Sequence, residues 1–105
     1  MSAKVECKAD VRNITILTET LRELNIAFEE ASGEVIVSRR FNNIIFDFNK
    51  KENNISHDSD DRSFLEKVLK NYQKNVAFNK AIKEGHTIKS CVEENGEIII
   101  RCVVN

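Results

Sequence analysis

The sequence lacks an apolar run of about 18 residues, and it therefore predicts no transmembrane helix. Its first residues, MSAKVECKAD, lack the apolar core of a signal peptide, so we expect a cytoplasmic protein. The net charge is −1, which supplies no overall field to attract nucleic acid or an anionic membrane. Proline is also absent while Asn, Lys and Ile are abundant, and we attribute this to codon usage rather than to function.

Closely spaced metal ligands are missing as well. The cysteines and histidines are scattered and include no CxxC pair: Cys7, Cys91, Cys102, His57 and His86. Asp58, Asp60 and Asp61 cluster in the middle of the chain, but they lack the spacing and the distal Glu of an EF-hand. We therefore expect free thiols, no metal and no cofactor.

The composition is that of one globular domain. Apolar residues make up 41% and charged residues 31% of the 105 positions, which excludes a disordered chain. The length accommodates a single domain, residues 1–105. Residues 49–61 are polar and without periodicity, and they predict a mobile loop.

The first quarter of the chain predicts a strand followed by a helix. Val5, Cys7 and Ala9 alternate with charged residues, as in a strand with one buried face. Asp10 is the expected N-cap of the helix, and Asn25 suits the left-handed position that ends it. One apolar stripe at helical spacing lies between them: Val11, Ile14, Leu17, Leu21 and Leu24.

Residues 26–48 predict three short antiparallel strands. A two-residue turn at residues 42–43 would place Val37 opposite Phe48 on the buried face. Ile45 then lies on the opposite face. Such one-sided patterning is typical of an antiparallel sheet with helices on one face.

A second helix follows the polar loop. Ser63 and Glu66 form a capping-box pattern at its start, and Gly85 ends it. The apolar stripe changes direction along the helix, so we expect either a bend near Asn75 or a second contact surface from Phe78 onward. Three lysines are expected on its water-exposed side: Lys67, Lys70 and Lys74.

The last two strands, HTIKSCVE and EIIIRCVV, form a hairpin whose register decides which side chains are exposed. A two-residue turn at residues 95–96 would put Arg101 on the core face. A three-residue loop that includes Glu94 and carries a bulge pairs Val92 with Ile98 and turns Arg101 outward. The hydrophobic pattern favours this second register.

These elements predict an α+β fold. We expect a two-layer sandwich with a mostly antiparallel sheet of five to six strands and two helices on one face. SGEVIV after the first helix is similar to NGEIII after the second, so two helix–hairpin units could build one sheet side by side. The alternative is that the similarity reflects no repeat, because a helix followed by a hairpin has such a pattern in many α+β proteins.

Several segments together resemble one protein family. They are Val5-x-Cys7-x-Ala9-Asp10, Ser38-Arg39-Arg40, Ile45-Phe46-Asp47, and residues 64–65, 76–80, 83–85 and 95–98. On these segments, which span nearly the whole chain, the protein resembles the family of hypothetical chloroplast open reading frame thirty-five as a divergent member. That family comprises small uncharacterised domains from cyanobacteria, other bacteria and plastids.

The resemblance implies an accessory component without established catalytic activity, often encoded near AAA-type ATPases. The family's middle element reads Tyr-Ala-Tyr-His-Lys, from which this chain departs at Val76, Phe78 and Asn79. It also lacks the family's tryptophans. If those side chains form a polar site, the site is missing here; if they only pack, little changes.

The outer face of the sheet is the candidate partner surface, because exposed apolar patches on small domains mark interaction sites. It is expected to contain Ile99, Arg101, Val103, Cys91 and Ile45. We expect a non-enzymatic adaptor that binds another protein, such as an AAA-type ATPase, or a second copy through this face or the last strand's edge. No catalytic residue is predicted, since Cys91 has no histidine base beside it.

An alternative class is a nucleic-acid or anionic-ligand binding module. Arg39 and Arg40 are the only adjacent arginines, and Lys50 and Lys51 follow the next strand. Arginine pairs bind carboxylates and phosphates through several N–H donors. The near-zero net charge argues against nucleic acid, and an enzyme ranks third.

Overall fold

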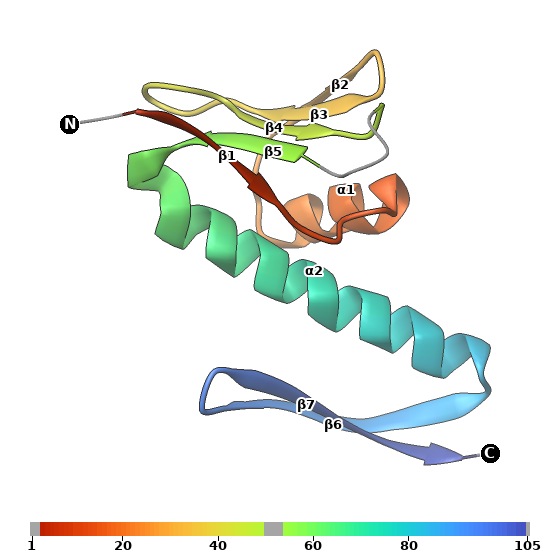
Figure 1. The fold of residues 1–105 in the computed structure, drawn as a ribbon. Helices are drawn as coiled ribbons and strands as arrows, with labels where there is room; N and C mark the ends of the chain where they lie inside the picture. Colours follow the sequence, from red (N-terminus) through yellow and green to blue (C-terminus); the bar gives the residue numbers. More distant parts are fainter. Residues whose placement is uncertain (1–2, 50–53, 105) are drawn as a thin grey trace.

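Two helices and two antiparallel sheets make up the computed structural model, which describes residues 3–49 and 54–104 (Figure 1). The larger sheet contains β1 (Lys4–Lys8), β2 (Glu29–Ala31), β3 (Glu34–Val37), β4 (Ile44–Asp47) and β5 (Asn54–Asp58). The two α-helices are α1 (Ile14–Glu23) and α2 (Arg62–Lys83), and the short 3-10 helix η1 (Ser59–Asp61) directly precedes α2. The smaller sheet is the hairpin of β6 (His86–Glu94) and β7 (Glu97–Val104).

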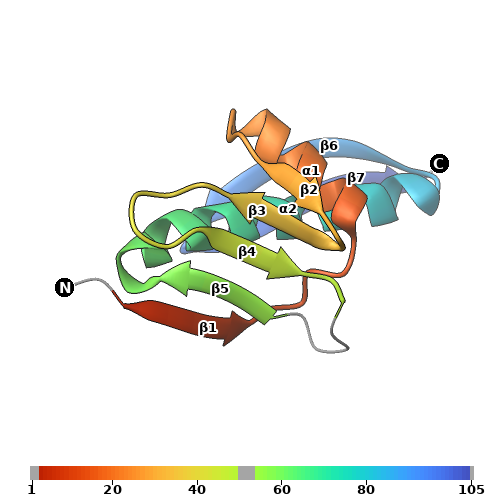
Figure 2. The same ribbon diagram turned by 90° about the horizontal axis from the view of Figure 1, so that it is seen from above.

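The five-stranded sheet has the order β1-β5-β4-β3-β2 with antiparallel neighbours throughout. Both α1 and α2 cover the same face of it (Figures 1 and 2). The apolar core between sheet and helices contains Val35, Val37, Ile44, Phe46, Ile55, Leu17, Leu21, Leu65 and Val68. The predicted α+β class, with an antiparallel sheet and two helices on one face, is confirmed.

The connection between β3 and β4 is longer than the sequence predicts. Val37 pairs with Ile44 rather than with Phe48, so residues 38–43 form a six-residue loop in place of a two-residue turn. The register is shifted by an even number of residues. Each side chain therefore keeps its predicted face, and Val37 and Ile44 are buried while Ile45 is not.

Strand β5 lies within the segment predicted to be a mobile loop, and that prediction is wrong for residues 54–61. Ile55 and His57 alternate with polar residues and are both buried, while β5 pairs with β1 and β4. The inward-facing positions show the period of two that defines a strand, although only Ile55 is strongly apolar. Residues 50–53 of the predicted loop, which include Lys50 and Lys51, lie outside the described residues.

Helix α1 begins later than predicted. Its N-cap is Asn13, whose Oδ1 accepts a hydrogen bond from the Ile16 N–H at 3.0 Å, whereas Asp10 forms an ion pair with Arg12. At the other end, Asn25 has φ +58°, which confirms the left-handed residue that follows the helix.

Helix α2 runs unbroken over 22 residues, so the predicted bend near Asn75 is wrong. The Asn75 side chain donates to Thr20 Oγ1 at 2.9 Å and to Glu23 Oε2 at 2.7 Å, and thereby joins α2 to α1. The helix starts at Arg62, so Ser63 lies inside the first turn rather than at the cap. Helix α2 does have a second contact surface, against β6 and β7. That surface includes Lys70 and Lys74, which precede the predicted start at Phe78, and Ile82 is exposed.

The hairpin forms a third layer beneath α2, on the side away from the five-stranded sheet (Figure 1). The expectation that all strands join one sheet is therefore wrong. Lys70 of α2 binds Glu93 of β6, so the lysine side of α2 partly faces the hairpin instead of water. A two-stranded sheet needs a packing partner to be stable, and α2 supplies one for one of its faces.

Candidate functional site

The register of the C-terminal hairpin is fixed by a two-residue turn. Asn95 and Gly96 have φ +52° and +80°, as a type I′ turn requires, and Glu94 pairs with Glu97. The predicted three-residue loop is wrong. The extra residue lies instead within β6, where a bulge interrupts the pairing between Ile88 and Ser90.

The alternation of β7 still follows the prediction. Ile98 and Ile100 lie on the α2 side, where they line a groove of about 310 Å³ together with Lys70 and Lys74. Ile99, Arg101 and Val103 occupy the opposite side by the period of two, and Arg101 and Val103 are exposed. Moving the bulge from the turn into β6 changes which β6 residues oppose β7, but it does not change which β7 residues face outward.

On β6 the outer residues differ from those predicted. Val92 pairs with Ile99, and Ser90 pairs with Arg101, so Val92 belongs to the outer side. Val92 and Val103 are 40% and 43% exposed. We call the set of Val92, Ile99, Arg101 and Val103 the hairpin face.

Two predicted members are not part of the hairpin face. Cys91 pairs with Ile100 and so shares the α2 side by register, although it is exposed. The prediction that Cys91 lies beside Arg101 on the outer side is therefore wrong. Ile45 lies on β4 in the other sheet, because the hairpin does not join that sheet. Sequence reasoning missed Val92, whose outward position depends on the bulge.

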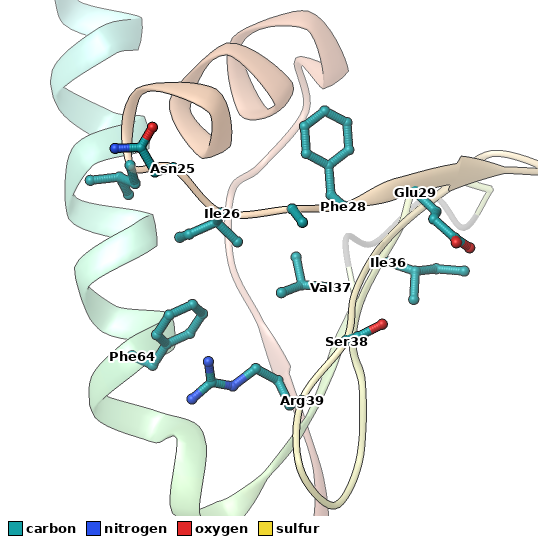
Figure 3. Close-up of a pocket in the computed structure, with 11 residues that line it drawn as sticks. Asn25, Ile26, Phe28, Glu29, Ile36, Val37, Ser38, Arg39 and Phe64 are labelled. Carbon is teal, nitrogen blue, oxygen red and sulfur yellow. The ribbon is translucent and has the colours of Figure 1, made fainter.

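The candidate anion-binding arginines have separate surroundings. Arg39 lines a pocket of about 550 Å³ that also includes Ile26, Phe28 and Phe64 (Figure 3). Its guanidinium lies 3.9 Å from the centre of the Phe64 ring. Arg39 Nε and one terminal nitrogen donate to Asp61 Oδ1 at 3.1 and 2.9 Å. Arg39 is thus already paired with a carboxylate of its own chain.

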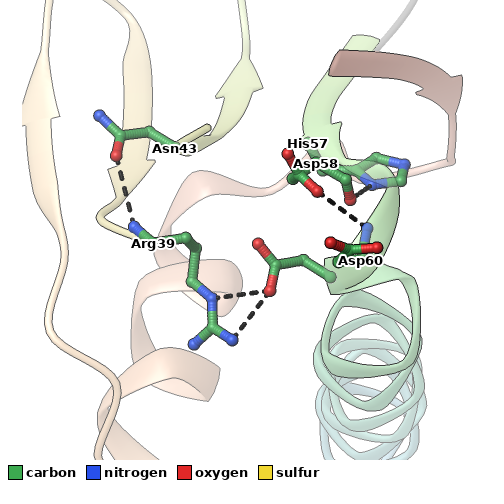
Figure 4. A network of polar contacts seen from close by, with 6 residues as sticks. Arg39, Asn43, His57, Asp58 and Asp60 are labelled. Carbon is green, nitrogen blue, oxygen red and sulfur yellow. Dashed lines mark hydrogen bonds and ion pairs between the residues drawn. The ribbon is translucent and has the colours of Figure 1, made fainter. Parts of the chain in front are cut away.

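Further polar contacts lie within the β3–β4 loop (Figure 4) and join it to the end of β5. Asn43 Oδ1 accepts from the Arg39 backbone N–H at 3.3 Å. Asp58, which is fully buried, accepts from the Asn42 side chain at 2.8 Å and from the Asp60 backbone N–H at 2.9 Å. The predicted acidic cluster therefore has a structural role in the described residues, which hold no group of three or more potential metal ligands.

Arg40, the second arginine of the pair, is exposed. Its guanidinium lies 5.2 Å from the centre of the Phe41 ring, and Phe41 itself is 57% exposed. Arg39 and Arg40 thus lie in different surroundings, and the structure does not bring their guanidinium groups to a common ligand site.

A second pocket, of about 380 Å³, lies beside β1 and α2 and includes Cys7, His57 and Arg62. Burial raises the pKa of the Cys7 thiol, and the nearby Arg62 charge only partly opposes this. A nucleophilic cysteine needs a lowered pKa. The His57 ring nitrogen Nδ1 lies 2.7 Å from the Asp58 carbonyl oxygen, within its own strand. This arrangement does not activate the thiol.

Comparison with family models, with curated proteins and with solved structures gave no match. The family resemblance described above therefore stays a prediction. No helix among the described residues has the length and apolar character needed to cross a membrane.

Proposed function

We propose that this protein is a non-enzymatic interaction module that binds another polypeptide through the hairpin face. The observation that carries this proposal is the pair of exposed valines: Val92 lies directly opposite Ile99, and Val103 follows Arg101 on the same side of β7. An apolar group on one sheet face, with a charged side chain among it, is the usual composition of a protein-interaction surface.

The energetics favour a covered hairpin face. Burying a valine completely contributes about 1.5–3 kcal/mol, so covering the exposed two fifths of Val92 or Val103 would contribute about 1 kcal/mol each. The hairpin has only two strands, and its other face packs on α2. A partner on the hairpin face would therefore also stabilise an element that is marginal by itself.

The position of the hairpin fits an accessory or adaptor subunit. Helix α2 separates it from the five-stranded sheet, so the hairpin face can bind a partner without disturbing the main core (Figure 1). The family resemblance makes an AAA-type ATPase the first class of partner to examine.

Capture from an extract of the source cells, with quantitative mass spectrometry, tests the proposal. The double variant Val92→Asp with Val103→Asp removes the apolar surface, and Phe41→Asp is the matched control at another exposed apolar site. We expect the double variant to lose about tenfold or more of the captured partner while the control retains it. Equal capture by folded wild type and double variant would refute the hairpin face as the binding site.

The same capture at low and moderate salt separates this function from anion binding. Contacts dominated by apolar burial persist when salt is raised, whereas binding through Arg39 and Arg40 would weaken steeply.

A further inference from the structure

We propose that β7 pairs edge to edge with β7 of a second copy, so that two hairpins form one four-stranded antiparallel sheet. The inference rests on the proposed function, because it takes the hairpin as the binding element of the protein. It goes further by naming what occupies the edge of β7, a surface distinct from the hairpin face.

The free edge of β7 carries backbone groups that point away from β6. A two-residue turn is closed by a hydrogen-bonded pair, here Glu94 and Glu97, and hydrogen-bonded and non-hydrogen-bonded pairs then alternate. Ile98 and Ile100 are therefore in non-hydrogen-bonded pairs, and their N–H and C=O groups point outward. Within residues 54–104, no strand pairs with this edge and no backbone bond from outside the hairpin reaches it. Such edges pair readily with another strand.

The charges of β7 select one register for self-pairing. The stretch Glu97-Ile98-Ile99-Ile100-Arg101 has opposite charges at its two ends. Antiparallel pairing centred on Ile99 places each Glu97 opposite the second copy's Arg101, and two-fold symmetry creates this ion pair twice. In the same register Ile98 lies opposite the second copy's Ile100, so the outward backbone groups of both residues meet.

Neighbouring registers lack this complementarity. Centring on Ile100 places Arg101 opposite the second copy's Ile99, and centring on Arg101 places two like charges opposite each other. Like charges directly opposite destabilise a sheet. The register centred on Ile99 is therefore the favoured one.

Among residues 3–49 and 54–104 of a single copy, neither Glu97 nor Arg101 has an ion-pair partner. Glu97 lies directly opposite Glu94 in the hairpin, which is a like-charge pair. Arg101 is exposed, and it forms no ion pair with any residue of the part of the chain that the structure describes. In the dimer, Arg101 of the second copy lies opposite Glu97, and Glu97 of the second copy lies opposite Arg101. These ion pairs offset the Glu94–Glu97 repulsion and give Arg101 a partner.

The four-stranded sheet would also enlarge the docking surface. It places two copies of Val92, Ile99 and Val103 on one continuous face. Val92 is on β6, and Val103 lies beyond residues 97–101, which pair with the second copy. Neither valine therefore takes part in the pairing. A dimer built at the edge uses Ile99 and Arg101 of the hairpin face but leaves both valines open for the partner proposed above.

Charge reversal followed by sedimentation equilibrium of the purified protein tests the pairing. We expect a wild-type dimer, and we expect Glu97→Arg or Arg101→Glu to raise the dimer dissociation constant by about tenfold or more, because two opposite-charge pairs become like-charge pairs. The combination of both substitutions should restore the dimer to within about threefold. Glu30→Arg, on the edge strand β2 of the other sheet, is the matched control and should change nothing.

Disulfide crosslinking reads the register directly, in a background with the native cysteines replaced. Ile99→Cys should crosslink two copies on mild oxidation, because residues directly opposite have Cβ atoms about 5 Å apart. Ile100→Cys and Arg101→Cys should crosslink much less. A protein that stays monomeric up to about 1 mM, or one that crosslinks best at position 100 or 101, overturns the proposal.

The two proposals fail separately. A monomer whose partner capture still depends on Val92 and Val103 refutes the dimer and leaves the proposed function intact. A dimer whose capture ignores both valines supports the edge pairing and refutes the hairpin face.

Discussion

Replacing Arg39 with alanine should destabilise the fold, because Arg39 connects the β3–β4 loop to the start of α2. The change removes two charge-assisted hydrogen bonds to Asp61 and the stacking on Phe64. Hydrogen bonds to charged groups contribute about 1.5–3 kcal/mol and a cation–π contact about 0.5–1 kcal/mol. The Arg39 and Asp61 side chains are 32% and 14% exposed, so solvent screens part of this. We expect a net loss of about 2 kcal/mol.

Urea unfolding measures this loss, with Arg40→Ala as the matched control. Arg40 is exposed and forms no ion pair within the described ranges, so its removal should change the free energy of unfolding by less than about 0.5 kcal/mol. A double-mutant cycle with Asp61→Ala should give a coupling energy of about 1 kcal/mol between Arg39 and Asp61.

Equal stabilities of Arg39→Ala and Arg40→Ala would refute this structural role of Arg39. They would also strengthen the alternative function, because an arginine that contributes nothing to stability is free to bind an anion. If both variants also bound inorganic phosphate more weakly than wild type, without any loss of stability, the anion-binding function would be supported.

Three further outcomes are expected. Tyr72→Phe should cost about 1–2 kcal/mol in urea unfolding, because the phenol oxygen accepts two backbone N–H groups at the start of α1, each at 3.1 Å. Gly33→Ala should lower the thermal midpoint through a loss of about 1–2 kcal/mol, because φ is +79° and an added Cβ would collide with the Asn49 side chain. The raised pKa of the Cys7 thiol should make its alkylation near pH 8 several-fold slower than that of exposed Cys91, read by peptide mass mapping, and unfolding should abolish the difference.

The same shift of the Cys7 thiol predicts a pH dependence of stability. Its folded pKa is raised, so the thiol form is favoured in the folded protein. The contribution is fully present below the pKa of the unfolded thiol and is lost as the pH rises through the folded pKa. Wild type should therefore lose stability in mildly alkaline solution relative to Cys7→Ala, and a parallel pH dependence of the two would contradict this.

The local periodicity of the sequence was sufficient to predict the helices and most core positions. Leu17 and Leu21 on α1 and Leu65 and Val68 on α2 are all buried, as their helical spacing predicts. The buried face of β3 and β4 was also predictable, because a shift of an even number of residues keeps each side chain on its face.

The unbroken course of α2 and the strand β5 depend on tertiary contacts, so the sequence pattern did not predict them. The amide of Asn75 lies in the middle of α2 and looks like a helix breaker, but it bonds to two side chains of α1. In β5, the buried His57 and Asp58 look like residues of a solvated loop until their pairing with Val5 and Lys4 of β1 is known. Neither set of partners is visible from local sequence.

The candidate site, too, was predictable from local periodicity only in part. The outward positions of Ile99, Arg101 and Val103 follow from the period of two along β7 alone. Val92 and Cys91 were assigned to the wrong sides, because a bulge between Ile88 and Ser90 reverses the faces of β6 beyond it. A bulge within a strand leaves no clear sequence signal here, since the hydrophobic pattern fits a bulge at the turn equally well.

Photo-crosslinking in the source cells is the direct test of whether the hairpin face binds another polypeptide. A photoreactive amino acid is placed at Val103, at Val92, or at the control position Phe41, all of which are exposed in the single chain. If the hairpin face binds a partner, Val103 and Val92 should each give the same specific adduct and Phe41 should give none. Adducts from Phe41 alone, or none from any position in cells that express the partner, would contradict it.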